Sequence, residues 1–397
     1  MRISKRTAGL TASITLAVDA QAKALKAQGV DVVGFGAGEP DFDTPENIKV
    51  AGIKAIESGA TKYTPATGSP ELKKAVAAKF LNENGLKYDP SQVIIACGGK
   101  HALFGAMMAL VDPGDEVIIP APYWVSYPDM VAVCGGKSVF VDGREDHGFK
   151  ITPDQLRQAL TKKTKVIILN YPSNPTGASY SVKELEALAD VVLEHPTAVV
   201  FSDEIYEHLL YDKAEFKSFA ALRPGLMDRT VTFNAVSKTY SMTGWRIGYL
   251  AGPADIIKAV GDLQSHSTSN PATMCQKAAL EALIGDQSSV EKMRLEFDRR
   301  RLRMVELLNA MPGVKCQKPN GAFYCFPNVR GAISKVLPKA KGPTTSAAFC
   351  EKILEDIHVA LVPGCGFGND DCVRLSFATS MANIEKGLGR LGEYLSR

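Results

Sequence analysis

Residues 230–249 read TVTFNAVSKTYSMTGWRIGY, in which a β-branched run leads into a turn that carries Lys238. The run Thr230–Phe233 predicts a buried strand, and the small residues after it allow the backbone to turn and present the lysine. If apolar neighbours and a nearby cation lower the pKa of Lys238, part of it is a neutral amine that can add to an aldehyde. Arg246 has a planar guanidinium that suits a phosphate dianion. A solvated loop lysine beside a structural arginine would explain the same residues, because most lysines are exposed.

Length and composition are those of an ordinary globular chain. Its 397 residues are too many for one simple core and favour two domains. A content of 45% apolar and 22% charged residues is typical of such proteins, and a net charge of +3 without a basic block gives no sign of nucleic-acid binding. The densest basic cluster, Arg299–Arg301 with Arg303, falls on a predicted amphipathic helix and is expected to be a solvated face.

The cysteines and the N-terminus bear on the compartment. The eight cysteines include no C-x-x-C pair and no grouping with histidine of the kind that binds metals, so we expect free thiols and no metal site. The segment Gly9–Val18 only faintly resembles a signal peptide, because hydroxyl residues interrupt its apolar part. No apolar run has the length that a membrane span needs. We therefore expect a cytoplasmic protein that does not bind membranes.

Short apolar runs alternate with helical patterns in the middle of the chain. Besides Thr230–Phe233, the predicted strands are Val93–Ala96, Glu116–Ile119, Val166–Asn170 and Ala198–Phe201. Alternation of this kind predicts an α/β domain with a mostly parallel sheet, whose ligands bind at the carboxyl ends of the strands. Five candidate site residues follow these strands and should meet at one edge of the sheet: Gly98, Trp124, Asn174, Asp203 and Lys238.

Most of these candidates also have a plain structural explanation. The turn Gly98-Gly99-Lys100 opens a helix, where amide groups can bind a phosphate, although glycines in such turns often serve packing alone. Trp124 could be a stacking platform or a half-buried core aromatic. Prolines and a glycine fix the loop around Asn174 and aim its amide. Asp203 ends a buried strand and is expected to need a cationic partner, a role that a structural arginine could fill.

Capping signals and composition set the expected boundaries. Thr44-Pro45 should supply an N-cap and a first helical residue, and Ser288-x-x-Glu291 should be the capping box of a long helix. In the last part of the chain, Arg374 lies inside an apolar strand, where an arginine needs an anion. The expected division is residues 1–45 as an N-terminal arm and part of a small domain, 46–290 as the large domain with the site candidates, and 291–397 as the small C-terminal domain.

Together and in this order, the motifs resemble the fold-type I pyridoxal-phosphate aminotransferases of class I, closest to the bacterial aspartate aminotransferase subgroup. The resemblance covers nearly the whole chain and rests on Gly38-Glu39-Pro40-Asp41, Tyr123-Trp124, Ser173-Asn174-Pro175-Thr176-Gly177, Ser202-Asp203-Glu204-Ile205-Tyr206, Ser237-Lys238 with Arg246, and Arg374. It implies pyridoxal 5'-phosphate as cofactor and a homodimer with active sites at the interface. It also implies the fold-type I architecture, a large α/β domain that binds the cofactor and a smaller α+β domain formed by the N-terminal arm and the C-terminal part.

The resemblance implies catalytic roles for the candidates. Lys238 would hold the cofactor as a Schiff base and move a proton between the substrate Cα and the cofactor. Asp203 would pair with the protonated pyridine nitrogen and so sustain the electron sink. Tyr206 and Asn174 would bind the phenolic oxygen of the ring, and Trp124 would stack on it.

The resemblance also implies how the cofactor phosphate is held. The Gly98-Gly99-Lys100 turn and Arg246 would bind it, together with Tyr63 from across a dimer interface. Some relatives have a phosphate-binding serine where this chain has Ala235, so Ser237 is the expected substitute. Each of the X–Pro bonds before Pro122 and Pro175 is expected to be cis, as in relatives.

Substrate binding follows from the same resemblance. Arg374 would clamp the α-carboxylate of the amino acid, helped by the backbone of Gly38 and lying near Trp124 and Asn174. The chain has no obvious counterpart of the arginine that other subgroups use for a distal carboxylate, and Lys100 is nominated instead. The implied reaction is aspartate with 2-oxoglutarate to give oxaloacetate and glutamate, by ping-pong transamination.

Other readings of the sequence remain open at this point. A broader or different substrate, such as an aromatic amino acid or alanine as donor, or prephenate, is one alternative. Relatives that use prephenate tend to read Lys-Pro-Ser-Ala-Thr near the N-terminus, whereas this chain reads Thr-Ala-Ser-Ile-Thr at residues 11–15. A β-C–S lyase could use the same scaffold. A nicotinamide dehydrogenase would need G-x-G-x-x-G after the first strand, and that motif is missing.

Overall fold

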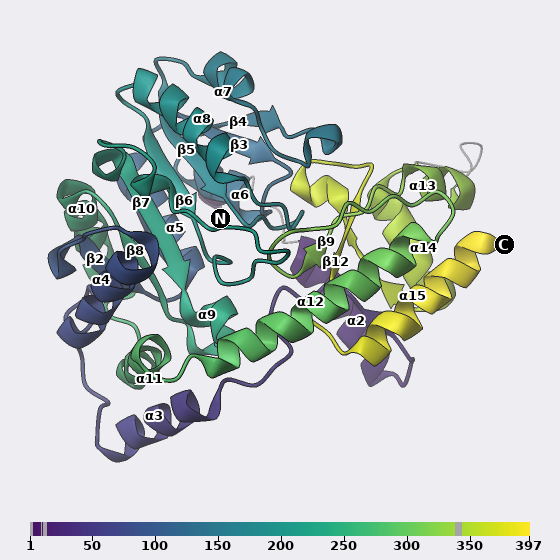
Figure 1. The fold of residues 1–397 in the computed structure, drawn as a ribbon, viewed down its shortest axis with the longest axis horizontal. Helices are drawn as coiled ribbons and strands as arrows, with labels where there is room; N and C mark the ends of the chain where they lie inside the picture. Colours follow the sequence, from purple (N-terminus) through teal and green to yellow (C-terminus); the bar gives the residue numbers. More distant parts are fainter. Residues whose placement is uncertain (1–2, 9, 11–13, 338–343) are drawn as a thin grey trace.

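The computed structural model describes residues 3–8, 10, 14–337 and 344–397. Its centre is a seven-stranded sheet in the order β2-β8-β7-β6-β5-β3-β4 (Figure 1). The strands are β2 (Val93–Ala96), β3 (Glu116–Ala121), β4 (Lys137–Asp142), β5 (Thr164–Asn170), β6 (Val199–Asp203), β7 (Thr230–Ala235) and β8 (Gly248–Ala251). Only β8 runs antiparallel to its neighbours, which are β2 and β7. The predicted mostly parallel sheet is therefore confirmed, with β4 and β8 added to the five predicted strands.

Both faces of this sheet are buried, which is why its strands read as continuous apolar runs. The alternation along β2 shows how the faces are divided: Ile94 and Ala96 pack in the cluster that contains residues of α5 (Gly99–Leu110), whereas Val93 and Ile95 pack in the cluster that contains residues of α4 (Pro70–Asn84). Helices accordingly lie on both sides of the strands (Figure 1). The remaining helices of this part are α3 (Glu46–Glu57), α6 (Ser126–Val133), α7 (Pro153–Ala159), α8 (Val182–Glu194), α9 (Val236–Thr239), α10 (Ala254–Ser265) and α11 (Thr273–Ile284).

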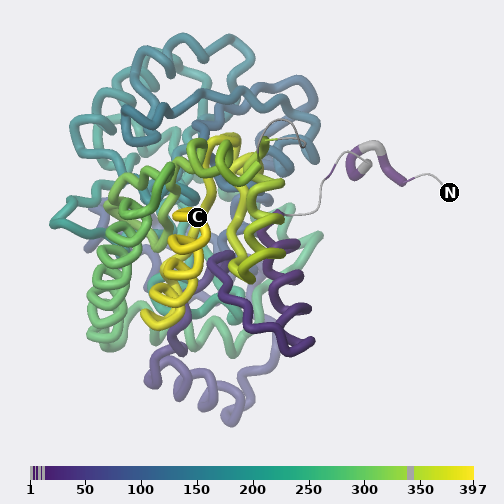
Figure 2. Tube along the Cα trace, turned by 90° about the vertical axis from the view of Figure 1, so that its right-hand side faces the viewer, coloured from purple at the N-terminus to yellow at the C-terminus, as the bar shows by residue number. Residues whose placement is uncertain are grey.

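The N-terminal segment and the last third of the chain share a second core. β1 (Val33–Gly34) pairs in parallel with β10 (Val359–Ala360), and an antiparallel sheet has the order β11-β12-β9. The elements of this part are α1 (Lys5–Ala8), α2 (Ile14–Ala27), α12 (Ser288–Asn309), β9 (Tyr324–Cys325), α13 (Arg330–Val336), α14 (Ser346–Ile357), β11 (Val362–Pro363), β12 (Val373–Ser376) and α15 (Met381–Ser396). This is the predicted small α+β unit built from both ends of the chain. Figure 2 shows α1 at the periphery of the molecule.

Of the two predicted domain boundaries, one coincides with the start of a helix and the other does not. The boundary at residues 45 and 46 coincides with the start of α3, whereas the one at residues 290 and 291 falls inside α12. In Figure 1, α12 runs from the neighbourhood of α9 toward α14. A helix that crosses from one core to the other blurs any single boundary, so the division into domains stays a prediction.

Two of the predicted helix starts are wrong. Pro45, not Thr44, occupies the N-cap position of α3, because the hydroxyl of Thr44 donates to Ser241 O at 2.7 Å and accepts from Trp245 Nε1 at 3.0 Å. α12 begins at Ser288 itself and has no side-chain cap. In both cases tertiary contacts or local geometry override a local sequence signal.

The arginine cluster on α12 is also only partly a solvated face. Arg300 is 6% exposed and Arg301 is fully buried. Arg301 pairs with Asp212 and Asp298 at 2.7 and 2.6 Å, and its guanidinium lies over the ring of Tyr211. The prediction failed because α12 contacts other elements on two sides, which local sequence cannot reveal. Within the described ranges, no helix has both the length and the apolar character to cross a membrane.

Candidate active site

The carboxyl edge of the central sheet faces the small unit across a cavity of about 330 Å³. Side chains that follow β3, β5, β6 and β7 line it from one side, and α2, β9 and β12 line it from the other. Nine of the predicted site residues line this cavity: Gly38, Gly99, Lys100, Trp124, Asn174, Asp203, Tyr206, Lys238 and Arg374. The structure thus brings together residues that lie up to 336 positions apart, from Gly38 to Arg374.

Lys238 lies in α9, directly after the buried strand β7. Its Nζ donates to the carbonyl oxygen of Gly38. Burial lowers the pKa of Lys238 to about 8; the carboxylate of Glu39 opposes this change, and the cations of Arg374 and Arg246 add to it. The amine is therefore partly neutral near neutral pH, which is the state that a nucleophilic amine needs.

Asp203, the last residue of β6, is a buried carboxylate without a cationic partner in the described part of the chain. Its Oδ2 accepts from the hydroxyl of Tyr127 at 2.6 Å. Burial raises the pKa of Asp203 to about 6, and the hydrogen bond from Tyr127 counteracts part of the shift. The expected cationic partner is thus not a protein side chain here, and the carboxylate can accept a cation from a ligand.

Arg374 is a buried guanidinium on β12 with no carboxylate partner among the residues that the structure describes. Its Nη1 donates to Asn174 Oδ1 at 2.9 Å, its Nη2 to Gly36 O at 2.8 Å, and its Nε has no partner. The rings of Tyr324 and Phe367 flank it at 4.6 and 5.1 Å. Burial lowers the pKa of Arg374. A planar cation with a free N–H group in a cavity suits a carboxylate ligand.

A chain of hydrogen bonds fixes Asn174 between the two units. The backbone N–H of Asn174 donates to Asn170 Oδ1 at 3.0 Å, and Asn170 Nδ2 donates to Asp203 O at 3.1 Å. The predicted cis bonds before Pro122 and Pro175 are confirmed, and the bond before Pro172 is cis as well. Asn174 therefore connects the end of β6 to Arg374.

A second predicted ligand group, Tyr206, is buried beside the cavity. Its hydroxyl lies 2.9 Å from that of Tyr324, a residue of β9. Tyr324 and Tyr127 were not among the predicted site residues. Tyr127 follows Trp124 by three positions at the start of a helix, and this spacing could have indicated it; no local signal could have indicated Tyr324.

The start of α5 has the features of an anion site. Gly98 precedes the helix with φ of 92°, and a Cβ at this position would lie 2.3 Å from Arg246 Nη2. Arg246 donates to the carbonyl oxygens of Thr243 and Cys97, and no carboxylate pairs with it in the described ranges. A guanidinium close to the first amides of a helix suits a phosphate.

Lys100, in the first turn of α5, lies beside this site. Its Nζ is 4.9 Å from the centre of the Trp124 ring. Burial lowers the pKa of Lys100, and the charge of Arg246 adds to the shift. The geometry therefore allows Lys100 to act on a ligand in the cavity or on a phosphate near Arg246.

Besides Gly98 and Arg246 of the anion site, two further predicted phosphate ligands do not line the cavity. Tyr63 is 92% exposed, so within one chain its hydroxyl faces solvent. Ser237 is buried beside Lys238. The roles expected of both residues stay predictions.

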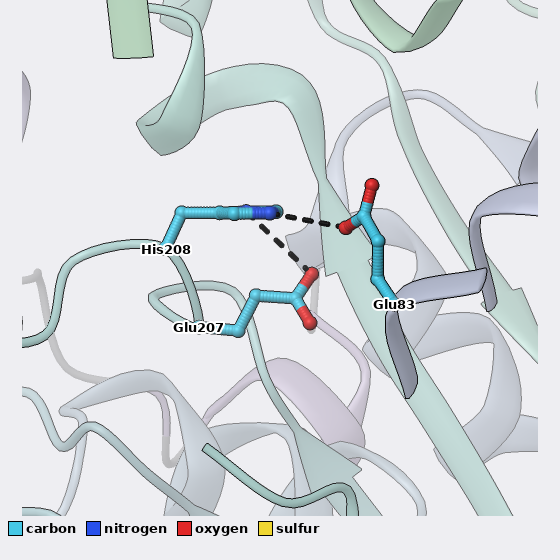
Figure 3. Close-up of side chains that lie close together, drawn as sticks. All are labelled: Glu83, Glu207 and His208. Carbon is cyan, nitrogen blue, oxygen red and sulfur yellow. Dashed lines mark hydrogen bonds and ion pairs between the residues drawn. The ribbon is translucent and has the colours of Figure 1, made fainter. Parts of the chain in front are cut away.

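An ion-pair network adjoins the cavity through Asn234, and Figure 3 shows three of its side chains. Glu83, Glu207 and His208 offer ligand atoms within 4.8 Å of one another, and His208 Nε2 lies 3.0 Å from Glu83 Oε2. The ammonium of Lys79 pairs with Glu207 and lies 3.5 Å from Glu83, so both carboxylates already face a cation. Glu207 also accepts a hydrogen bond from Asn234 of β7. We therefore describe this group as a structural network that joins α4 to the sheet.

Known proteins resemble this chain along its whole length. The model of the aminotransferase class I and II family matches residues 30–391. The aspartate aminotransferase of Geobacillus stearothermophilus is 52% identical over 100% of this chain and 99% of the relative. The aspartate/prephenate aminotransferase of Cereibacter sphaeroides is 50% identical over 98% of this chain and 97% of the relative.

Solved structures of aspartate aminotransferases also superimpose on this chain over its whole length. The aspartate aminotransferase of Rhizobium meliloti superimposes with a TM-score of 0.96 at 46% identity, covering 100% of this chain and 99% of the other. The Thermus thermophilus aspartate aminotransferase with maleate gives a TM-score of 0.93 at 44% identity, with both chains fully covered. The fold, the family match and the full-length relatives together show that this chain belongs to the class I and II aminotransferases.

Proposed function

We propose that the protein is a pyridoxal-phosphate-dependent aspartate aminotransferase, which converts aspartate and 2-oxoglutarate to oxaloacetate and glutamate. The observation that carries this proposal is one cavity that holds three unmatched groups. They are an amine of lowered pKa and, as far as the described residues go, a buried carboxylate without a cation and a buried guanidinium without an anion: Lys238, Asp203 and Arg374. The full-length relatives named aspartate aminotransferase support the same function.

The residues around the cavity fit pyridoxal phosphate. Asp203 would hold a protonated ring nitrogen, because its carboxylate is buried with only a tyrosine hydroxyl as side-chain partner. Arg246 and the first amides of α5 at Gly99 would hold the phosphate. Trp124 would offer a ring face for stacking. When bound, this cofactor supplies an aldehyde that links covalently to amines and a ring that withdraws electrons from the substrate.

The chain's own residues would then handle the substrate and the proton. Arg374 has an unpartnered Nε with which to orient an α-carboxylate. Lys238, as a neutral amine, would accept a proton from the donor Cα and pass it to the cofactor in the first half-reaction, and would carry a proton in the opposite direction in the second. The hydroxyls of Tyr206 and Tyr324, 2.9 Å apart, would donate toward oxygens in the cavity.

Selectivity for a dicarboxylic acid would depend on a second cation. Lys100 is the candidate, because it lines the cavity and has no carboxylate partner among the described residues. Its ammonium would meet the distal carboxylate of aspartate or glutamate while Arg374 holds the α-carboxylate.

Prephenate is the alternative amino acceptor with specific support. A relative that is 50% identical is named aspartate/prephenate aminotransferase. Against it stands the departure from the Lys-Pro-Ser-Ala-Thr pattern at residues 11–15, of which Thr11–Ser13 lie outside the described residues. Aspartate therefore remains the proposed donor and 2-oxoglutarate the proposed acceptor.

We also infer a homodimer in the cytoplasm. Tyr63 is 92% exposed, and Ile53 and Ile56 on neighbouring α3 are 54% and 56% exposed, as expected for a surface that a second copy covers. All eight cysteines are free, which fits a reducing compartment.

The test is a panel of amino donors against 2-oxoglutarate and oxaloacetate, with release of pyruvate and ammonia followed in parallel. Aspartate with 2-oxoglutarate should give the highest kcat/KM. Pyruvate and ammonia formed without a keto-acid acceptor would indicate a lyase, and a preference for aromatic donors or prephenate would indicate the alternative aminotransferase.

A further inference from the structure

The segment Gly38–Thr44 runs alongside the segment that carries Lys238 and is joined to it at several points. Lys238 Nζ donates to Gly38 O, and the hydroxyl of Thr243 donates to Glu39 Oε2 at 2.6 Å. Ser241 bonds both Phe42 O and the Thr44 hydroxyl, the latter through its own carbonyl oxygen at 2.7 Å. The position of residues 38–44 therefore determines where the Lys238 amine meets Gly38 O and how strongly the charge of Glu39 acts on that amine.

On its other side, this segment is held by α12. Arg300 Nη1 lies 2.7 Å from Asp41 Oδ1, and the Arg300 guanidinium covers the ring of Phe42 at 4.9 Å. Phe297, one turn earlier on α12, packs edge-on against Phe42 at 5.2 Å. Arg300 is 6% exposed, so its pairing with Asp41 takes place largely away from water.

The residues just before this segment are anchored in a different way. Phe35 donates from its N–H to Ala360 O at 2.9 Å, and Phe35 O accepts from Ser376 N at 2.8 Å. Gly36, whose carbonyl oxygen accepts from Arg374, is thus held by strand pairing rather than by α12. A disturbance at Arg300 should reach Gly38 and Lys238 but not Gly36 and Arg374.

We propose that Arg300 and Asp41 are a positioning pair for Lys238. Through residues 38–44 they hold the Gly38 carbonyl against the reacting amine and keep the Glu39 carboxylate near enough for its charge to act on that amine, with no contact of their own to it. The inference rests on the proposed function only in taking Lys238 as the reacting amine.

The charges that face Lys238 give this pair a measurable signature. Glu39 and Asp203 favour the protonated nitrogen, whereas Arg374 and Arg246 disfavour it. If the 38–44 segment is released, Glu39 withdraws and the positive form loses a stabilising carboxylate. The nitrogen at Lys238 should then lose its proton at lower pH, whether it is the free amine or linked to the cofactor.

The experiment compares three variants of the full-length holoenzyme: Arg300→Met, Asp41→Asn and the control Arg299→Met. Arg299 is the matched control, because it is the preceding residue of α12 and pairs with the same carboxylate, Glu296, as Arg300. For each variant, kcat with aspartate and 2-oxoglutarate is measured per bound cofactor. The affinity for succinate, a dicarboxylate that cannot react, and the pH midpoint of the visible absorbance of the holoenzyme are measured beside it.

For Arg300→Met and Asp41→Asn we expect kcat to fall about ten- to a hundredfold, as misplacement of a reacting group does. The pH midpoint should fall by about 0.5 unit or more, and the succinate Kd should stay within about twofold because Arg374 is held separately. A fourth variant that combines Arg300→Met with Asp41→Asn should lose little more than either single variant, since both substitutions remove the same interaction. Arg299→Met should leave all three quantities unchanged.

Two results would overturn the positioning role. One is a loss of thermal stability in both variants with kcat and midpoint unchanged, which would make the pair merely structural. The other is a fall in kcat and in the pH midpoint of Arg299→Met as large as the fall in Arg300→Met. If Arg300→Met does not fold, Asp41→Asn decides, because Asp41 is partly exposed and asparagine has nearly the size of aspartate without its charge. Failure of the proposed function would be distinct, since the unmodified protein would then show no visible chromophore and no transamination.

Discussion

Two buried arginines in this molecule have almost the same surroundings and differ in one respect. Arg301 and Arg374 are 0% and 2% exposed, and each guanidinium lies 4.6 Å from the centre of a tyrosine ring. Arg301 pairs with two carboxylates, whereas among the described residues Arg374 bonds only an amide and a backbone carbonyl and leaves its Nε without a partner. Burial and stacking are thus common to both, and the missing anion is what distinguishes Arg374 and supports its proposed role in binding a ligand.

Two buried carboxylates, Glu207 and Asp203, differ in the same way as the two arginines. Glu207 faces Lys79 in the network that adjoins the cavity, whereas Asp203 has a tyrosine hydroxyl in place of a cation. Charges that are matched within the chain hold the fold together. Charges left unmatched around one cavity cost stability in the free protein, and we attribute that cost to binding of cofactor and substrate.

The largest effect should come from Asp203→Asn. Loss of the negative charge would remove the group that keeps the cofactor ring protonated, so kcat should fall about a thousandfold or more. Glu207→Gln is the matched control, because Glu207 is a buried carboxylate that does have a cationic partner. This variant should be less stable than the parent, while its kcat stays within about tenfold of the parent value. Turnover of Asp203→Asn close to that of the parent would contradict the role of Asp203.

A smaller effect separates the two arginines. Arg374→Met should lower kcat/KM for aspartate by about a hundredfold or more, because a buried charge-assisted contact is lost, and it should change stability little. Arg301→Met should do the opposite, lowering the free energy of unfolding by about 3 kcal/mol while kcat/KM is nearly unchanged. Urea unfolding and steady-state kinetics on both variants test this. If the two variants lose stability and kcat/KM to a similar extent, the proposed difference between the two arginines is wrong.

The pH dependence of stability should show the unmatched carboxylate directly. In the cofactor-free protein the pKa of Asp203 is about 6, above its value in an unfolded chain. The folded state therefore binds more protons between about pH 4 and 6, and its stability falls as the pH rises through that window. Relative to Asp203→Asn, the parent should lose about 3 kcal/mol of unfolding free energy between pH 4 and 7. If the difference in unfolding free energy between the parent and Asp203→Asn stays constant across this pH range, the pKa of Asp203 is not raised in the folded state.

The smallest effect concerns substrate selectivity. Lys100→Ala should remove a contact worth about 1.5–3 kcal/mol from dicarboxylic donors only, which is roughly ten- to a hundredfold in kcat/KM. Phenylalanine as donor should be affected much less. Measurement at saturating cofactor is needed, because a lysine that served the phosphate would slow every donor alike and weaken cofactor binding.

The strand pattern alone indicated much of the site. Gly98, Trp124, Asn174, Asp203 and Lys238 follow apolar runs, and parallel strands bring such positions to one edge. The lysine in the turn after β7 could be found in this way because its position depends on the local strand and turn, although the groups around its amine come from distant parts of the chain.

The partners of these residues could not be predicted. Tyr127 and Tyr324 reach Asp203 and Tyr206 over 76 and 118 positions of the chain. Arg300 looked like part of a solvated run, yet it meets Asp41 across 259 positions. Thr44 carried a capping signal, but Ser241 and Trp245 take its hydroxyl. Contacts of this kind depend on how the two cores are packed, which no window of sequence contains.

The central claim is that the amine of Lys238, rather than a matched lysine such as Lys79, links to the cofactor. Borohydride reduction of the purified holoenzyme, followed by peptide mapping, tests it most directly, because only a carbon–nitrogen double bond is fixed by this treatment. The account predicts loss of the visible absorbance and a stable pyridoxyl label on Lys238 alone. Label on any other lysine, or no label at all, would contradict it.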